Sequence, residues 1–127
     1  MVTINRLDHL VLTVKDINTT AEFYSNVLGM KRVEFGDRRV SLTFGHQKIN
    51  LHQAGKEFEP KAHRPTPGSA DLCFISETHL AEATAHIQGL GVDIIEGPVT
   101  RIGAQGKMQS IYFRDPDLNL IEISSYL

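Results

Sequence analysis

The stretch YFRDPDLNLIEI, from Tyr112 to Ile123, says more about the fold than any other part of the chain. It runs from the end of an aromatic strand, through a turn rich in Asp and Pro, into a strand expected over Leu120–Ser124. Side chains alternate between the two faces of a strand, so Ile121 and Ile123 share one face and Glu122 lies on the other. The pattern predicts a carboxylate directed away from an apolar row.

The same order of elements occurs twice along the chain, which indicates an internal repeat. A shift of 62 positions places apolar and glycine residues of the first half on similar residues of the second, among them Leu10 on Leu72, Ala21 on Ala83, Leu28 on Leu90 and Gly29 on Gly91. Further along, an offset of 69 places Ser41 on Ser110 and Phe44 on Phe113. The second half is therefore expected to have gained residues near Thr100–Gly106.

Each half is predicted to form a strand, a helix and three further strands. In the first half the helix follows the N-cap candidates Asp16–Thr20 and ends at Gly29, a C-cap candidate. The strands expected around it are Leu7–Val14, Met30–Phe35, Arg39–Phe44 and Lys48–His52. In the second half the helix is expected over Thr78–Leu90, closed by Gly91, and the strands over Ala70–Ile75, Val92–Ile95, Met108–Phe113 and Leu120–Ser124.

The predicted fold class is therefore α+β, with two βαβββ modules that form a cupped mixed sheet. The modules are expected over 5–53 and 70–127, within a single domain over 1–127. Residues 54–69 have the composition of a linker, because they contain three of the five prolines and several charges.

Composition excludes several classes of function. The 127 residues carry 13 basic and 15 acidic side chains, a formal charge of -2 without a basic stripe, so neither nucleic acid nor an anionic membrane is an expected partner. The one cysteine, Cys73, excludes an internal disulfide and a cysteine-based zinc site and fits a reducing compartment. No apolar run is long enough to span a membrane and no signal peptide is evident, so a cytoplasmic location is expected.

Polar side chains occur at matching positions on the faces that point away from the helices. They belong to four strands: His9, Asn50 or His52, Asp71, and Glu122. The 62-residue shift makes His9 and Asp71 equivalent. Imidazole and carboxylate groups bind Zn, Ni, Fe, Mn or Co, and three or four such ligands leave positions open for substrate oxygens. A polar residue on a strand face is more often simply exposed, so it is the agreement across four strands that indicates a site.

These motifs resemble a known family. YFRDPDLNLIEI, together with LDHLVLTVKDINTTAEFYSNVLGM at Leu7–Met30, looks like the paired signatures of the vicinal oxygen chelate superfamily of glyoxalases, bleomycin-resistance proteins and extradiol dioxygenases, closest to the glyoxalase-domain-containing proteins. The resemblance implies metal ligation by His9 and Glu122. Asp71 stands where glyoxalase I and fosfomycin-resistance enzymes usually have a second histidine. The remaining ligand position falls in INLHQ, where either Asn50 or His52 fits, and His52 is expected because imidazole is the better ligand.

The resemblance implies a divalent-metal-dependent lyase or isomerase of the glyoxalase I type. Its substrate would be an oxoaldehyde adduct of a thiol such as glutathione, or a related molecule with two neighbouring oxygens, and Glu122 would be the catalytic base. The competing prediction is a ligand-sequestering protein without catalysis, which Asp71 favours modestly. Dioxygenase chemistry is less favoured, because a His-Asp-Glu set is not a two-histidine, one-carboxylate triad. A homodimer is also implied, in which His9 and His52 of one chain could meet Asp71 and Glu122 of the other.

Three further residues are candidates for contact with a small-molecule substrate. Asn50 shares its strand face with His52. Arg101 lies in the glycine-containing segment TRIGAQG, where a mobile lid could meet an anionic substrate, although an ordinary surface loop is the simpler expectation. Phe113 is expected as core or as a wall of the cup.

Overall fold

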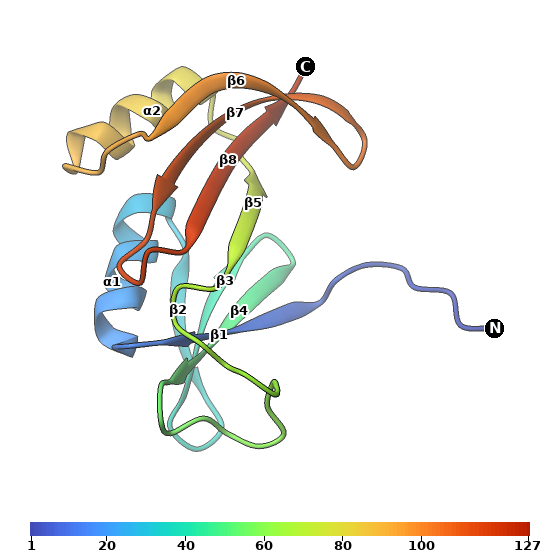
Figure 1. Ribbon diagram of the computed structural model, residues 1–127, viewed down its shortest axis with the longest axis vertical. Helices are drawn as coiled ribbons and strands as arrows, with labels where there is room; N and C mark the ends of the chain where they lie inside the picture. Colours follow the sequence, from blue (N-terminus) through green and yellow to red (C-terminus); the bar gives the residue numbers. More distant parts are fainter. The chain divides into compact units, whose positions relative to one another are not determined.

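The computed structural model describes all 127 residues and divides into two compact units, Met1–Pro67 and Gly68–Leu127. Each unit contains one helix and one four-stranded sheet, and the chain before the first strand is extended (Figure 1). Neither helix has the length and apolar character needed to cross a bilayer.

The first unit has the element order β1 (His9–Val14), α1 (Ile17–Leu28), β2 (Lys31–Phe35), β3 (Arg39–Phe44) and β4 (Gln47–Gln53). In space the strands follow the order β1-β4-β3-β2, with β1 parallel to β4 and the other pairs antiparallel. Helix α1 begins where the Asp16 carboxylate accepts a hydrogen bond from the Thr19 amide at 3.0 Å. It ends at Gly29, whose φ of 67° is left-handed and suits glycine.

The second unit repeats this order with β5 (Asp71–Ile75), α2 (Leu80–Gly89), β6 (Glu96–Gly103), β7 (Gly106–Arg114) and β8 (Leu120–Tyr126). Its strands follow the order β5-β8-β7-β6, with β5 parallel to β8. The predicted pair of βαβββ modules is confirmed, as two mixed four-stranded sheets.

Alternate residues of the strands separate an apolar row from a polar row in both units. The buried apolar residues include Leu12, Val14, Leu42, Ile49 and Leu51 in the first unit and Ile111, Phe113, Ile121 and Ile123 in the second. Helix α1 contacts β2, β3 and β4, while α2 contacts β7 and β8. The apolar rows form the cores, so the polar rows occupy the faces opposite the helices.

Two boundaries differ from the sequence prediction near Thr100–Gly106, the segment that the second half was expected to have gained. The strand expected over Val92–Ile95 instead begins at Glu96, and the segment expected as a loop or lid, Thr100–Gly106, forms the end of the β6–β7 hairpin. A bulge separates Glu96 from Val99 in this hairpin. At the bulge Gly97 has a φ of 111°, and a Cβ there would lie 2.5 Å from the Ser110 carbonyl oxygen, so glycine permits the close approach.

The offset of 69 for the third strand of each module was also wrong. Ser41 pairs with Asn50 in the first sheet, and Tyr112 pairs with Glu122 at the matching place in the second. Ser41 therefore corresponds to Tyr112 rather than to Ser110. Two hydroxyl residues in similar apolar surroundings gave a false match, because alternation alone does not fix register.

Candidate functional site

The strand registers define equivalent positions in the two units without any comparison of residue types. His9 begins β1 and Asp71 begins β5. Two residues later, Val11 pairs with Asn50 in the first unit and Cys73 pairs with Glu122 in the second. His9 and Asn50 in one sheet therefore correspond to Asp71 and Glu122 in the other.

We call the row opposite α1 the first polar face. It comprises His9, Val11 and Thr13 on β1, Lys48, Asn50 and His52 on β4, Arg39, Ser41 and Thr43 on β3, and Lys31, Val33 and Phe35 on β2. The His9 side chain is 43% exposed, and its Nδ1 lies 2.8 Å from the Asp8 carboxylate. This contact leaves Nε2 of the imidazole as the nitrogen available for a ligand.

The register separates His52 from His9. His9 pairs with Lys48, whereas His52 pairs with Thr13, about 13 Å further along β4 at the usual strand rise. His52 is only 5% exposed, and its ring meets the Phe58 ring edge-on at 5.5 Å. Burial, and then the nearby Arg39 guanidinium, hold the pKa of His52 below its usual value, while Glu57 opposes them. His52 is therefore a neutral imidazole packed under Phe58.

Asn50 lies between those two levels, about 7 Å along the strand from the position opposite His9. Its Oδ1 is buried and has no hydrogen-bond partner. A buried acceptor without a donor is uncommon in folded proteins. Of the two residues that the sequence left open, the register and this free oxygen favour Asn50 as the partner of His9.

Cations and aromatic rings also pack against one another on the first polar face. The Lys48 Nζ lies 4.1 Å from the centroid of the Phe35 ring. The Arg39 guanidinium carbon lies 5.8 Å from the same centroid and 4.5 Å from that of Phe58. Phe58, which belongs to the segment expected as a linker, thus packs on the sheet, and no sequence signal distinguished it from its polar neighbours.

The second polar face is the row opposite α2. It includes Asp71 and Cys73 on β5, Glu122 and Ser124 on β8, Ser110, Tyr112 and Arg114 on β7, and Glu96 and Arg101 on β6. Glu122 lies at its centre. The Ser124 hydroxyl donates to its Oε2 at 3.1 Å, and Ser124 Oγ also lies 2.7 Å from Ser110 Oγ and 3.3 Å from Cys73 Sγ. A hydroxyl has one proton to donate, so Ser110 and Cys73 donate to Ser124. Ser124 and Ser110 have no exposed surface. This buried network fixes the orientation of the Glu122 carboxylate.

The predicted substrate contact Arg101 belongs to a second network on the same face. Its Nε donates to the Tyr112 hydroxyl at 3.0 Å, and another guanidinium nitrogen donates to Glu96 at 3.1 Å. Burial raises the pKa of Tyr112, the Arg101 hydrogen bond opposes this, and the Glu122 carboxylate adds to the rise. Arg101 is therefore tied to strand residues, not carried on a free loop.

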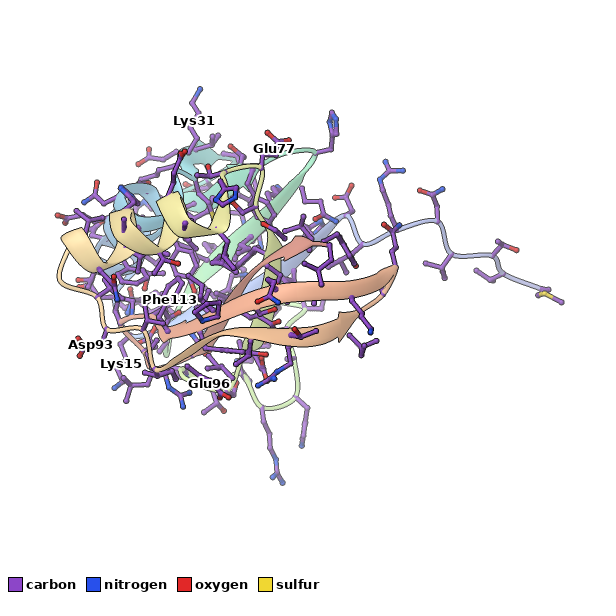
Figure 2. The ribbon with its side chains drawn as sticks, turned by 90° about the horizontal axis from the view of Figure 1, so that it is seen from above. Lys15, Lys31, Glu77, Asp93, Glu96 and Phe113 are labelled. Carbon is purple, nitrogen blue, oxygen red and sulfur yellow. The ribbon has the colours of Figure 1, made fainter.

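Phe113 lies on the wrong side of its strand for contact with a substrate at Glu122. It pairs with Ile121 and has no exposed surface, whereas the adjacent Tyr112 pairs with Glu122. In Figure 2 Phe113 lies among the packed side chains, while Lys31 extends away from the ribbon. The alternative expectation, that Phe113 is a core residue, fits this position.

The turn between β7 and β8 explains why the DPDLN motif delivers Glu122. Asp115 is 3% exposed, and its Oδ1 accepts from the amides of Asp117 and Asn119 at 2.9 and 3.0 Å. Its Oδ2 accepts from the Asn119 side chain at 2.8 Å. The Asn119 Oδ1 in turn accepts from the Ala70 amide at 2.8 Å, next to Asp71. One buried carboxylate thereby aligns the start of β8 with the start of β5.

A separate cavity of about 630 Å³ lies in the second unit beside the start of α2. Its lining includes Thr84 on the helix, and Gln109 and Ser125 on the sheet face opposite Glu122. None of the residues predicted to bind metal or substrate lines it.

The ligand-type residues fit a divalent cation in their chemistry. The structure contains no cluster of three or more His, Cys, Asp or Glu side chains that could hold a metal ion. Each polar face instead presents a pair at equivalent positions, His9 with Asn50 and Asp71 with Glu122. Imidazole nitrogen and carboxylate or amide oxygen are suitable donors, and the unpaired Asn50 Oδ1 is an acceptor that a cation would satisfy.

The family of the chain follows from comparison with known proteins. Residues 6–123 match the model of the Glyoxalase/Bleomycin resistance protein/Dioxygenase superfamily, so nearly the whole chain is covered. The chain belongs to this superfamily, as the resemblance of its motifs predicted.

Several relatives have high sequence identity to this chain over nearly its whole length. Virulence protein STM3117 of Salmonella typhimurium is 60% identical over 98% of this chain and 86% of its own. Glyoxalase domain-containing protein RDO1 of Mycosarcoma maydis is 57% identical over 97% of this chain and 69% of its own. The solved integron cassette protein VCH_CASS1, from the mobile metagenome of V. cholerae, superposes with a TM-score of 0.98 at 62% identity, covering 100% of this chain and 99% of that one.

More distant relatives carry named activities. A lactoylglutathione lyase of Pseudomonas aeruginosa is 28% identical over 91% of this chain and 80% of its own. The metallothiol transferase FosB of Shouchella clausii is 26% identical over 94% of this chain and 80% of its own.

Proposed function

We propose that the protein is a divalent-metal-dependent lyase or isomerase of the glyoxalase I type. Its substrate would be the hemithioacetal of a small oxoaldehyde and a thiol such as glutathione, or a related molecule with two neighbouring oxygens. The observation that carries the proposal is the occurrence of ligand-type pairs at equivalent register positions of both polar faces. The distant similarity to a lactoylglutathione lyase supports it.

The proposed metal ligands form one pair on each polar face, His9 with Asn50 and Asp71 with Glu122. Asn50 replaces His52 in this set, because His52 is buried beneath Phe58 and its register lies far from His9. Asp8 would orient the His9 ring through Nδ1, the role that carboxylates have beside metal-bound histidines.

Glu122 is the proposed base of the reaction. A divalent metal, when bound, supplies a Lewis acid that stabilises negative charge on substrate oxygens. The Glu122 carboxylate would remove the proton from the carbon bearing the thiol and return it to the neighbouring carbon. The hydroxyl of Ser124 holds Oε2 in one orientation, which keeps the base positioned for both transfers. Tyr112 pairs with Glu122 across the strands, and Arg101 in turn donates to the Tyr112 hydroxyl.

Metal content tests the proposal directly. Plasma mass spectrometry of the purified protein is expected to find a near-stoichiometric divalent metal that is lost in a His9→Ala, Glu122→Ala double variant. A His46→Ala, Glu77→Ala double variant removes one exposed histidine and one exposed glutamate outside the proposed ligand set, and is expected to keep the metal. Metal-replete protein that leaves the methylglyoxal–glutathione hemithioacetal unchanged would contradict the proposed reaction.

Binding without catalysis is the second candidate function. The observation that favours it is the first polar face, where the half-buried Phe35 ring, the two cations against it and the neutral Asn50 amide would contact an organic ligand. Absence of metal even after reconstitution, together with retained ligand binding, would select this function. The homodimer and the cytoplasmic location stay predictions.

A further inference from the structure

We propose that the first polar face contains an anion-binding site, formed by Arg39 and Lys48 around Phe35, which takes the carboxylate or phosphate group of a small molecule. As a binding site it stands on the geometry alone. As the place where the substrate's acidic group is held, it rests on the proposed function, because it lies beside Asn50.

The two cations lack the carboxylate partners that charged side chains usually have. The ion pairs of the protein involve other basic residues, and neither Arg39 nor Lys48 has a carboxylate within ion-pair distance. None of the twelve strand positions of the first polar face is Asp or Glu, whereas Lys31, Arg39 and Lys48 are basic. Two carboxylates act on neighbouring groups of this face: Asp8 on His9 and, last among its partners, Lys48, and Glu57, which acts on His52 and pairs with Lys61.

Aromatic rings hold both cations in place without using up their hydrogen-bond donors. Phe35 contacts Lys48 and Arg39, and Phe58 contacts Arg39 from the segment after β4. A cation over a ring face is attracted by the ring quadrupole, while its N–H groups stay free to donate at the edge. The side chains are therefore ordered before a ligand arrives, which lowers the entropy that binding costs.

Both cations also lie against the same aromatic ring, that of Phe35. Both lie within 6 Å of the Phe35 centroid, although the register puts Arg39 and Lys48 on either side of the Ser41–Asn50 pair. An oxyanion in this position would accept charge-assisted hydrogen bonds from a guanidinium and an ammonium together. Arg39, Lys48 and Phe35 are all half-buried, so a small anion can reach them and is partly shielded from water.

The chemistry does not separate a carboxylate from a phosphate, so the test uses one probe of each kind. Succinate and inorganic phosphate are titrated into the metal-free full chain at constant ionic strength, and binding is followed by amide chemical shifts. We expect saturable binding of at least one probe, with shifts at Arg39 and Lys48, and the tighter probe identifies the class of acidic group. Lack of saturable binding by both would overturn the inference.

Charge-matched variants separate a built site from general attraction. Arg39→Gln and Lys48→Gln are each expected to weaken binding about tenfold or more. Lys31→Gln removes the same charge from the same sheet, at a side chain that extends into solvent, and is expected to change binding less than twofold. Equal weakening in all three variants would overturn the proposal.

Arg39→Lys guards against loss of folding, because it keeps the charge where Gln would remove both charge and stacking. It is expected to bind more tightly than Arg39→Gln at a similar melting temperature, and the reverse order would count against the site. Because the anion titration uses metal-free protein, its result does not depend on the proposed metal-dependent reaction. Anion binding without metal or turnover would remove the proposed function alone, while metal binding without anion binding would remove this inference alone.

Discussion

The two polar faces occupy equivalent places in the two units but carry different sets of charges. The first presents Lys31, Arg39 and Lys48 without a carboxylate. The second presents three carboxylates together with two arginines: Asp71, Glu96, Glu122, Arg101 and Arg114. The apolar rows beneath them are alike, because each must pack against a helix. The packing rows preserve the fold, and the opposite rows are free to acquire different roles.

Replacing the equivalent residues Glu122 and Asn50 gives the largest expected contrast. Glu122→Gln is expected to lower kcat for the methylglyoxal–glutathione hemithioacetal by about 10²–10⁴-fold, because the base is lost. Asn50→Ala is expected mainly to weaken metal binding, so excess metal restores part of its activity. Steady-state kinetics over a range of metal concentrations measure both effects.

A matched carboxylate on the same face serves as the control for this prediction. Glu96→Gln removes an exposed partner of Arg101 and is expected to change kcat little. If Glu96→Gln and Glu122→Gln were equally impaired, the loss would reflect the charge of the face and not a specific base.

The second largest contrast is in stability, between substitutions in the β7–β8 turn and in the β3–β4 turn. Asp115→Ala removes three hydrogen bonds to a buried carboxylate and leaves donors of Asn119 and Asp117 unpaired, so it should lower the free energy of unfolding by about 2–4 kcal/mol. His46→Ala, at the exposed β3–β4 turn, should change it by less than about 0.5 kcal/mol. Urea unfolding measures both, and similar values would show that the buried turn is not special.

The smallest expected contrast is in the pH dependence of the unfolding free energy. His52 can be protonated, whereas Ser124, at the equivalent position of the second unit, does not titrate. The folded pKa of His52 lies below the unfolded value of 6.5, so the unfolded chain binds the proton more readily. The resulting stability is fully present above pH 6.5 and is lost as the pH falls through the folded pKa. His52→Gln should flatten the decline of unfolding free energy below pH 6.5. An unchanged slope would assign that decline to other groups.

The sequence predicted the order of elements and the faces of the strands because both follow from local periodicity. Ile121 and Ile123 against Glu122, or the capping of α1 by Asp16 and Gly29, need no information from distant residues. The confirmed family membership extends this agreement to nearly the whole chain.

The assignments that local periodicity could not make depend on long-range contacts. Asn50 and His52 share a face, and only the pairing with β1 shows which of them lies nearer to His9. Phe58 has a role because it folds back onto Arg39, which its position in a proline-rich segment does not reveal. Phe113 and Tyr112 both have aromatic side chains, and their register with β8 decides which is core and which faces Glu122.

The β6–β7 hairpin shows how one copy of a repeated module can grow without being rebuilt. Beyond the bulge, its arms continue to pair residue for residue, with Arg101 opposite Met108, Ile102 opposite Lys107 and Gly103 opposite Gly106. Added in this manner, each new amino acid on one arm is matched by one on the other, so the backbone groups that face the opposing arm stay hydrogen-bonded. The end of such a hairpin can accept insertions in evolution, because a change in its length leaves the strand register at Glu122 unchanged.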